Sequence, residues 1–117
     1  MSELSVLQKR VLEFRDARDW KQFHNPKDLS ISLLAEAMEL LDEFKWKDTA
    51  AVEKHLKENK DSVMDEVMDV LYQVLLISAE LNIDIPKEFE RKMLKNEAKY
   101  PIEKSKGNNK KYLELKN

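Results

Sequence analysis

The sequence predicts an all-α protein, and three observations carry this prediction. Apolar residues recur at steps of three and four along most of the chain, which is the spacing of one helix face. Only one Gly and three Pro occur among the 117 residues, and 38 % of the residues are charged against 42 % that are hydrophobic. Such a composition is typical of a helix-rich globular protein, so we expect a single domain over residues 1–117.

The first two helices are expected on either side of a short loop. The first should end near Arg18, and its apolar face consists of Leu4, Leu7, Val11 and Phe14. A loop is expected over residues 19–27 because Asn25-Pro26 disfavours helical backbone. The second helix should run to about Phe44, with Asp28 or Ser30 as its N-cap. A polar connection follows over residues 45–60, with a short helical turn expected at 52–56.

The third helix, expected over residues 61–81, is the longest and is apolar around most of its circumference. Its polar stripe is narrow and consists of Ser62, Asp65, Glu66, Asp69, Gln73 and Glu80. A helix so widely apolar is normally buried on several sides, and one small domain offers few neighbours for it. We therefore expect a homo-oligomer, a dimer or a tetramer, whose core includes this helix.

A fourth helix should begin at Pro86 and end before Pro101, with Phe89, Met93 and Leu94 facing inward. From Lys87 onward, ten basic residues stand against five acidic ones. The last stretch, residues 103–117, contains the only Gly of the chain. We expect this stretch to form a mobile basic tail.

Net charge and residue types exclude several classes of function. The net charge is -2 at pH 7, and the basic residues form no stripe with interleaved aromatic side chains, so no nucleic-acid partner is expected. No signal peptide and no apolar run of about 18 residues is present. We therefore expect no membrane partner, and we expect a cytoplasmic location. The absence of Cys excludes disulfides, thiol catalysis and thiolate metal sites.

Acidic residues are segregated from basic ones on the second and third helices. Residues 28–44 and 61–86 contain eleven Asp and Glu but no Lys or Arg, although the chain has 21 basic residues. Glu36, Glu39 and Glu43 share one stripe of the second helix, and Glu66 and Asp69 share one face of the third. Like charges at these spacings cost roughly 0.2–0.5 kcal/mol per pair. An antiparallel hairpin would bring Glu36-x-x-Glu39 and Glu66-x-x-Asp69 together as oxygen ligands for one or two divalent cations such as Mg2+.

Other interpretations of the acidic residues are less favoured. A solvent-exposed acidic face is the simplest, since acidic pairs are common on helices. The missing Lys and Arg on both helices, beside a wide apolar arc, favour the metal site. A di-iron bundle also uses facing carboxylates, but it needs Glu-x-x-His motifs, and neither His24 nor His55 follows a Glu at that spacing. One Gly cannot build a phosphate-binding P-loop.

Aromatic residues flank the second helix. Trp20, Phe23 and His24 precede it, and Trp46 follows it. Aromatic rings can stack on a nucleobase, and a His can bond to the edge of the base. Each of these side chains could instead belong to the core or to the surface. Together, beside an acidic motif, they indicate a pocket for the base of a nucleotide.

The chain contains five segments in a characteristic order: RDWKQFHNP (18–26), EAMELLDEFKW (36–46), DEVMDVL (65–71), KNEAKYP (95–101) and KGNNKKY (106–112). These segments resemble the MazG-like nucleotide pyrophosphohydrolases, and more narrowly the branch that contains the dCTP pyrophosphatases. The resemblance covers residues 4–115. It implies an all-α NTP pyrophosphatase fold, which is a four-helix bundle completed by oligomerisation into a dimer or a dimer of dimers.

The resemblance also implies roles for individual residues. The metal ligands would be Glu36, Glu39, Glu66 and Asp69. Glu39 is the first choice, and Glu36 the second, for the catalytic carboxylate that orients or deprotonates the attacking water. The substrate would be bound by Trp20, His24, Trp46, Lys95, Asn96, Lys99, Tyr100, Lys106 and Lys111, with the Lys side chains on phosphate oxygens. The chain departs from the family pattern at Asp28, where the closest relatives often have Asn, and at Ala37-Met38, where some have a Gly. Both departures leave the ligands intact and bear on base preference.

The expected function is Mg2+-dependent hydrolysis of a nucleoside triphosphate to the monophosphate and pyrophosphate, as house-cleaning of the nucleotide pool. Mn2+ is the expected substitute ion, and dCTP or a modified dCTP is the first expected substrate. One alternative changes the substrate, to that of a dUTP or phosphoribosyl-ATP type pyrophosphatase. Another changes the class, to a noncatalytic helical adaptor or antitoxin-like binding module that docks through its acidic face.

Overall fold

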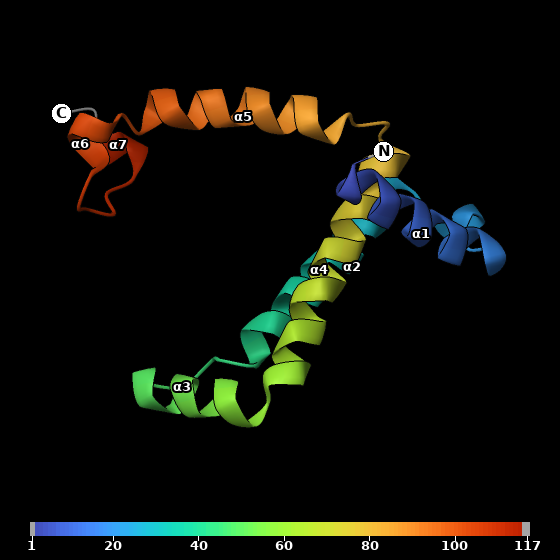
Figure 1. Cartoon of the computed structure of the whole chain (residues 1–117), viewed down its shortest axis with the longest axis horizontal. Helices are drawn as coiled ribbons and strands as arrows, with labels where there is room; N and C mark the ends of the chain where they lie inside the picture. The colour runs from blue at the N-terminus through green and yellow to red at the C-terminus, as the bar shows by residue number, and fades with distance from the viewer. Residues whose placement is uncertain (1, 116–117) are drawn as a thin grey trace. The chain divides into compact units, whose positions relative to one another are not determined.

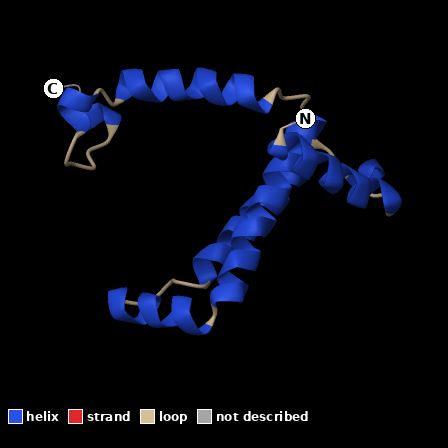
Figure 2. Ribbon diagram, in the orientation of Figure 1, coloured by secondary structure: helices blue, strands red, loops and turns tan. Residues whose placement is uncertain are grey.

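The computed structural model describes residues 2–115 and confirms the all-α prediction. Within these residues every regular element is helical and no strand occurs (Figure 2). No described helix is both long enough and apolar enough to cross a membrane. The elements in order are α1 (Glu3–Ala17), the 3-10 helix η1 (Lys21–Phe23), α2 (Pro26–Asp42), α3 (Thr49–Glu58), α4 (Lys60–Glu80), α5 (Ile85–Lys99), α6 (Ile102–Ser105) and α7 (Tyr112–Leu115).

The chain divides into two compact units, so the single domain stays a prediction. The first unit carries α1 to α4 and ends at Asn82, and the second begins at Ile83 and carries α5 to α7. In the first unit, α4 packs along α2 in an antiparallel hairpin and also contacts α1 and α3 (Figure 1). Gln8 on α1 donates a hydrogen bond from Nε2 to the carbonyl oxygen of Leu75 on α4, at 3.1 Å. The buried apolar side chains of this unit are Val11, Leu29, Val63, Leu75 and Leu76.

The start of α2 differs from the prediction. Asn25 is the N-cap, because its side-chain oxygen accepts a hydrogen bond from the backbone N–H of Asp28 at 2.9 Å. The assignment of the cap to Asp28 or Ser30 was therefore wrong. Pro26 is tolerated in the first turn because a helix start needs no backbone N–H there, so the Asn-Pro pair begins the helix and does not precede it in a loop. The loop between α1 and α2 is shortened further by η1.

The connection between the two acidic helices is more helical than expected. The helix α3 spans Thr49–Glu58, where the sequence predicted only one turn at 52–56. Asp48 caps it, with a side-chain oxygen that accepts from the backbone N–H of Ala51 at 2.9 Å. The helix α2 ends at Asp42, and Trp46 then adopts φ +66°, which is uncommon for a bulky residue.

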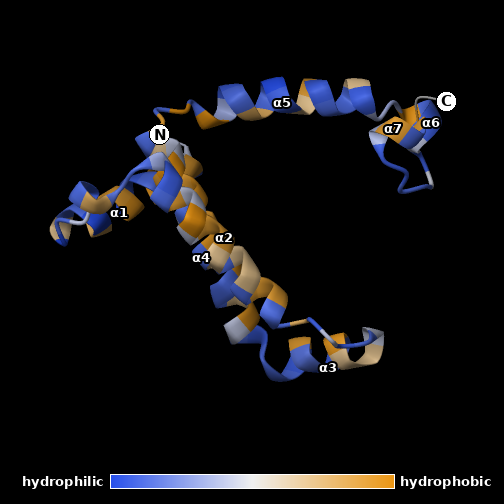
Figure 3. Ribbon diagram, turned by 180° about the vertical axis from the view of Figure 1, so that it is seen from behind, coloured by the Kyte–Doolittle hydropathy of each residue, from blue (hydrophilic) through white to orange (hydrophobic). Residues whose placement is uncertain are grey.

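Many large apolar side chains on α2 and α4 are exposed in the single chain. They are Ile31, Leu34, Met38 and Leu41 on α2, and Met64, Val67, Met68 and Val74 on α4. Figure 3 shows apolar residues along both helices. Only part of the wide apolar surface of α4 is therefore covered within the first unit, and the homo-oligomer stays a prediction that would cover the rest.

In the second unit, Asp84 caps α5, with a side-chain oxygen that accepts from the backbone N–H of Lys87 at 3.2 Å. Pro86 lies in the first turn of α5, as the sequence predicted, although the helix begins one residue earlier. The segment predicted to be a mobile tail contains helical structure, in α7 and most of α6, and the turn between them uses Gly107 at φ +81°. Its mobility stays a prediction, and residues 116–117 lie outside the described residues.

Candidate metal and nucleotide site

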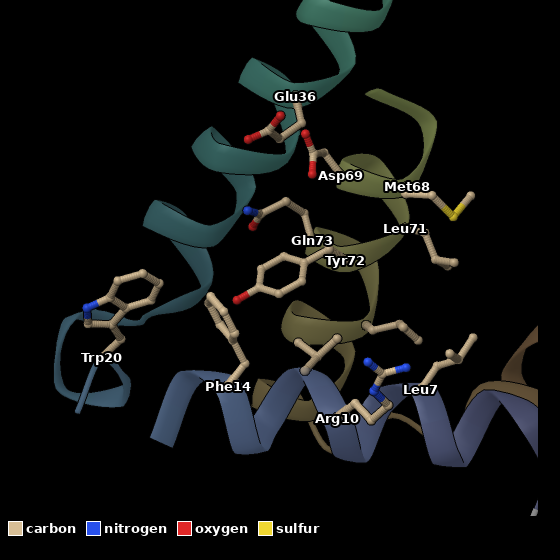
Figure 4. A pocket seen from close by; sticks show the side chains of 12 residues that line it. Leu7, Arg10, Phe14, Trp20, Glu36, Met68, Asp69, Leu71, Tyr72 and Gln73 are labelled. Atoms are coloured by element: carbon tan, nitrogen blue, oxygen red, sulfur yellow. The ribbon is translucent and has the colours of Figure 1, made fainter. Parts of the chain in front are cut away.

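The α2–α4 hairpin brings together the four carboxylates of the two acidic motifs. Oxygens of Glu36, Glu39, Glu66 and Asp69, one from each side chain, all lie within 4.8 Å of one another. In Figure 4 the side chains of Glu36 and Asp69 point toward one another from the two helices. Each pair of carboxylates shares one helix face because its two residues are three apart. Antiparallel packing of α2 and α4 then brings the two faces together.

The cluster is electrostatically strained without a cation. Burial raises the pKa of Glu36, and the neighbouring carboxylates of Glu39, Asp69 and Glu66 raise it further. Burial also raises the pKa of Glu66, again assisted by Glu39 and Asp69. The Oε2 atoms of Glu36 and Glu66 are buried and have no hydrogen-bond partner. Unpartnered carboxylate oxygens at this spacing are a donor set that fits a hard divalent cation.

Glu43 shares the stripe of Glu36 and Glu39 in the sequence but is engaged elsewhere in the structure. Its carboxylate accepts hydrogen bonds from Ser62 Oγ at 2.6 Å and from His55 Nε2. The Ser62 hydroxyl, followed by His55, holds the pKa of Glu43 below its usual value. A cavity of about 280 Å3 beside the cluster is lined by Glu39, Asp42, Glu43, His55 and Glu66. No role for His55 was predicted from the sequence, because its partner Glu43 lies twelve residues away at the end of another helix.

An aromatic groove runs from the carboxylates toward α1 (Figure 4). It measures about 660 Å3, and its lining includes Glu36, Asp69, Trp20, Phe14 and Tyr72. The ring of Phe14 meets Trp20 edge-on with centroids 5.7 Å apart, and meets Tyr72 edge-on at 6.1 Å. Burial raises the pKa of Tyr72. Aromatic side chains therefore lie next to the candidate metal site, as expected for Trp20.

Two residues that line a further cavity, of about 300 Å3, each have a polar atom without a partner. Its lining includes Trp20, Phe23, His24 and Gln73, and His24 Nδ1 and Gln73 Oε1 are both buried with no hydrogen-bond partner. Trp20 and His24 thus line the same cavity, and their role in binding a base stays a prediction. Gln73 was expected on the polar stripe of α4, with no role predicted for it. Its position four residues after Asp69, on the same helix face, was the signal available.

Of the other predicted substrate residues, one belongs to the first unit and six belong to the second. Trp46 follows the C-terminus of α2, whereas His24 precedes the N-terminus of that helix. Trp46 is 95 % exposed and lines neither of the cavities that Trp20 lines. The remaining predicted substrate residues belong to the second unit, and they are Lys95, Asn96, Lys99, Tyr100, Lys106 and Lys111. Within that unit Lys99 Nζ lies 5.8 Å from the centroid of the Tyr112 ring, and Asn96 Nδ2 lies 3.9 Å from Met93 Sδ. The substrate-binding roles of these residues stay predictions.

Comparison with known proteins identifies similar sequences and a similar fold. The model of the MazG-like family matches residues 31–115, which include all four carboxylates. dCTP pyrophosphatase 1 of Rattus norvegicus is 34 % identical over 105 residues, which are 88 % of this chain and 62 % of that protein. dCTP pyrophosphatase 1 of Homo sapiens is 31 % identical over the same shares of both chains. The chain thus spans 62 % of the length of these curated relatives. The crystal structure of a pyrophosphatase from Archaeoglobus fulgidus superposes with a TM-score of 0.80 at 35 % identity, covering 86 % of this chain and 94 % of that one.

Proposed function

The chain belongs to the MazG-like family, and from that premise we propose that it hydrolyses a nucleoside triphosphate to the monophosphate and pyrophosphate. The observation that carries the proposal is the group of four carboxylate oxygens within 4.8 Å of one another. No Lys or Arg occurs in residues 28–44 or 61–86, which carry these side chains, so the negative charge is left for a cation from outside the chain. The names of the relatives, dCTP pyrophosphatase 1 and pyrophosphatase, support the same activity.

Mg2+ is the proposed ion, with Mn2+ as a substitute, and its ligands are Glu36, Glu39, Glu66 and Asp69. When bound, such an ion neutralises charge on the triphosphate and lowers the pKa of a coordinated water. The buried, unpartnered oxygens of Glu36 and Glu66 suit them to hold the ion. Glu39 is exposed, so its carboxylate is open to solvent water. We therefore keep Glu39 as the first choice for the group that orients or deprotonates the attacking water, and Glu36 as the second.

The base is proposed to lie among the aromatic side chains beside the carboxylates, with Trp20 as a stacking surface. His24 Nδ1 and Gln73 Oε1 are buried and unpartnered in the cavity that Trp20 lines, so a ligand that bonds to them recovers the free energy lost on burying them. An amide oxygen accepts from an exocyclic amine. Cytosine has such an amine, and uracil has a carbonyl oxygen at that position. With its Oε1 facing the base, Gln73 favours dCTP or a modified dCTP over dUTP as the substrate.

Further substrate contacts are proposed for residues of the second unit and for Trp46. Lys95, Lys99, Lys106 and Lys111 are proposed to bind phosphate oxygens, with Asn96, Tyr100 and the exposed Trp46 as further substrate contacts. Charge-assisted bonds from Lys to phosphate are strong enough for this role. A homo-oligomer, a cytoplasmic location and a role in cleaning the nucleotide pool complete the proposal.

A panel of NTPs and dNTPs with Mg2+, followed by product analysis, tests the function. We expect a monophosphate and pyrophosphate, with dCTP or a modified dCTP turned over fastest. Preference for dUTP or phosphoribosyl-ATP would favour the first alternative. Release of a diphosphate and phosphate would overturn the proposed reaction. No turnover of any substrate with Mg2+ or Mn2+ would favour a noncatalytic binding module. Glu39→Gln is the matched control for the role of the carboxylate, since it keeps the size of the side chain and removes the negative charge of Glu39.

A further inference from the structure

Glu43 connects three helices near the carboxylate cluster. It is the C-cap residue of α2, and its carboxylate accepts from Ser62 Oγ in the first turn of α4, at 2.6 Å, and from His55 Nε2 in the last turn of α3. Asn59 Nδ2 lies 3.1 Å from His55 Nδ1 and donates to it, which leaves the proton of His55 on Nε2. The side chains of Glu43 and His55 are only 12 % and 18 % exposed. Both oxygens of Glu43 are therefore used inside the protein.

The register of these contacts places them beside the cluster. Glu43 follows Glu39 by four residues on α2, and Ser62 precedes Glu66 by four residues on α4. Residues four apart share a helix face and lie about 6 Å apart along its axis. Because the two helices are antiparallel, the hydrogen bond between Glu43 and Ser62 spans them one turn beyond Glu39 and Glu66.

Local helix physics does not explain a Glu at this position. A carboxylate at a helix C-terminus opposes the helix dipole, and Glu43 also lines a cavity with Glu39, Asp42 and Glu66. Its role differs from that of Glu36 and Glu66, each of which keeps one buried oxygen without a partner. The hydrogen bonds of Glu43 instead link α2 to α3 and α4. They lie at the end of the hairpin where the carboxylates of α2 and α4 repel one another.

We propose that Glu43, Ser62 and His55 form a strut that positions Glu39 and Glu66 for cation binding. The strut holds α2 and α4 at the separation that the ion requires before any ion arrives. Its members are positioning residues, and they are neither ligands nor catalytic residues. The inference rests on the cation site of the proposed function, but it does not depend on which nucleotide is hydrolysed.

Mn2+ binding to the full chain, measured by the electron paramagnetic resonance of free Mn2+, tests the strut without using activity. Ser62→Ala removes the hydroxyl without changing charge, and we expect it to weaken Mn2+ binding about fivefold, the factor that corresponds to one lost hydrogen bond. Ser62→Thr keeps a hydroxyl and should restore binding. Ser62→Ala that binds Mn2+ as tightly as the wild type would overturn the strut.

Two variants of Glu43 separate the Ser62 hydrogen bond from the rest of the carboxylate. Glu43→Gln keeps an oxygen that accepts from Ser62 but turns an amide N–H toward the donor His55 Nε2, so we expect its Mn2+ affinity to lie between those of the wild type and Glu43→Leu. Glu43→Leu removes both contacts and should weaken binding as much as Ser62→Ala or more. If Glu43→Gln bound Mn2+ no more tightly than Glu43→Leu, the Ser62 hydrogen bond would not position the cluster and the strut would be wrong. Far-UV circular dichroism checks that each variant is folded.

The same experiment distinguishes failure of the strut from failure of the proposed function. A wild-type protein that binds no Mn2+ would remove the cation site, and the strut with it. A wild type that binds Mn2+, together with an unaffected Ser62→Ala, would overturn the strut alone. In activity assays the strut also predicts that Ser62→Ala needs more Mg2+ for half-maximal rate but reaches nearly the wild-type kcat at saturating Mg2+. A loss of kcat that Mg2+ does not restore would contradict a positioning role.

Discussion

Glu36 on α2 and Glu66 on α4 share one feature: each keeps a buried carboxylate oxygen without a hydrogen-bond partner, in a cluster whose oxygens lie within 4.8 Å of one another. Most buried polar groups in proteins are satisfied, so two unsatisfied carboxylate oxygens in one cluster require a cause. A cation bound between the two helices would satisfy both. The first two predictions follow from that relationship.

The metal-free protein should gain stability when one of these carboxylates is neutralised. The pKa of Glu66 is raised from 4.5 in the folded state, so the folded state holds its proton more tightly than the unfolded state does. Stability from this group is therefore present below the unfolded pKa and is lost as the pH rises through the raised folded pKa. In urea unfolding with EDTA, Glu66→Gln should be at least as stable as the wild type at pH 7, and this advantage should shrink toward pH 4. A variant that unfolds at pH 7 would show that Glu66 is a structural partner of a basic group.

Mg2+ with nucleotide should raise the melting temperature of the wild type and leave that of Glu66→Gln unchanged. A ligand that binds only the folded state stabilises it by mass action, by about 2.7 kcal/mol at a hundred times its Kd. Thermal unfolding with a nonhydrolysable triphosphate analogue measures the shift without turnover. Asp65→Asn is the matched control, because it removes a neighbouring charge on α4 that is not part of the cluster. An equal shift in Glu66→Gln would exclude Glu66 as a ligand.

Gln73→Leu should lower kcat/KM for a cytosine nucleotide about fivefold, which corresponds to one hydrogen bond of about 1 kcal/mol. The physical reason is the loss of Gln73 Oε1, which is buried and unpartnered in the cavity that Trp20 lines. The loss should be larger for dCTP than for dUTP. Steady-state kinetics with both substrates checks the prediction, and an equal loss for the two would show that Gln73 does not read the base.

Sedimentation at micromolar concentration should show a symmetric oligomer. Leu34 and the other large apolar side chains of α2 and α4 named above are exposed in the single chain, so a second copy is expected to cover them. Leu34→Glu places a charge in that surface and should shift the protein toward monomer. Glu103→Gln in the second unit is the control and should leave the mass unchanged. A wild type that sediments as a monomer would contradict the predicted oligomer.

The sequence alone determined the four longest helices, α1, α2, α4 and α5, and the carboxylate pairs, because both depend on short-range spacing. Glu36 and Glu39 lie on one face wherever residues 26–42 are helical, and the absence of Lys and Arg from that face is visible in the sequence. The N-cap of α2 is also a local feature, and its misassignment came from taking Asn25-Pro26 as a loop signal when the pair begins a helix.

Only the tertiary structure decided which side chains on those faces serve which partner. Glu43 lies on the same stripe as Glu36 and Glu39, yet it turns to His55 and Ser62, because these lie on α3 and α4 and reach it only once the hairpin has formed. Gln73 and His24 line one cavity for the same reason, since the end of η1 and α4 come together by packing and not by proximity in the sequence. The spacing of residues thus determines the face of a helix, whereas the partner of each side chain depends on which helices pack together.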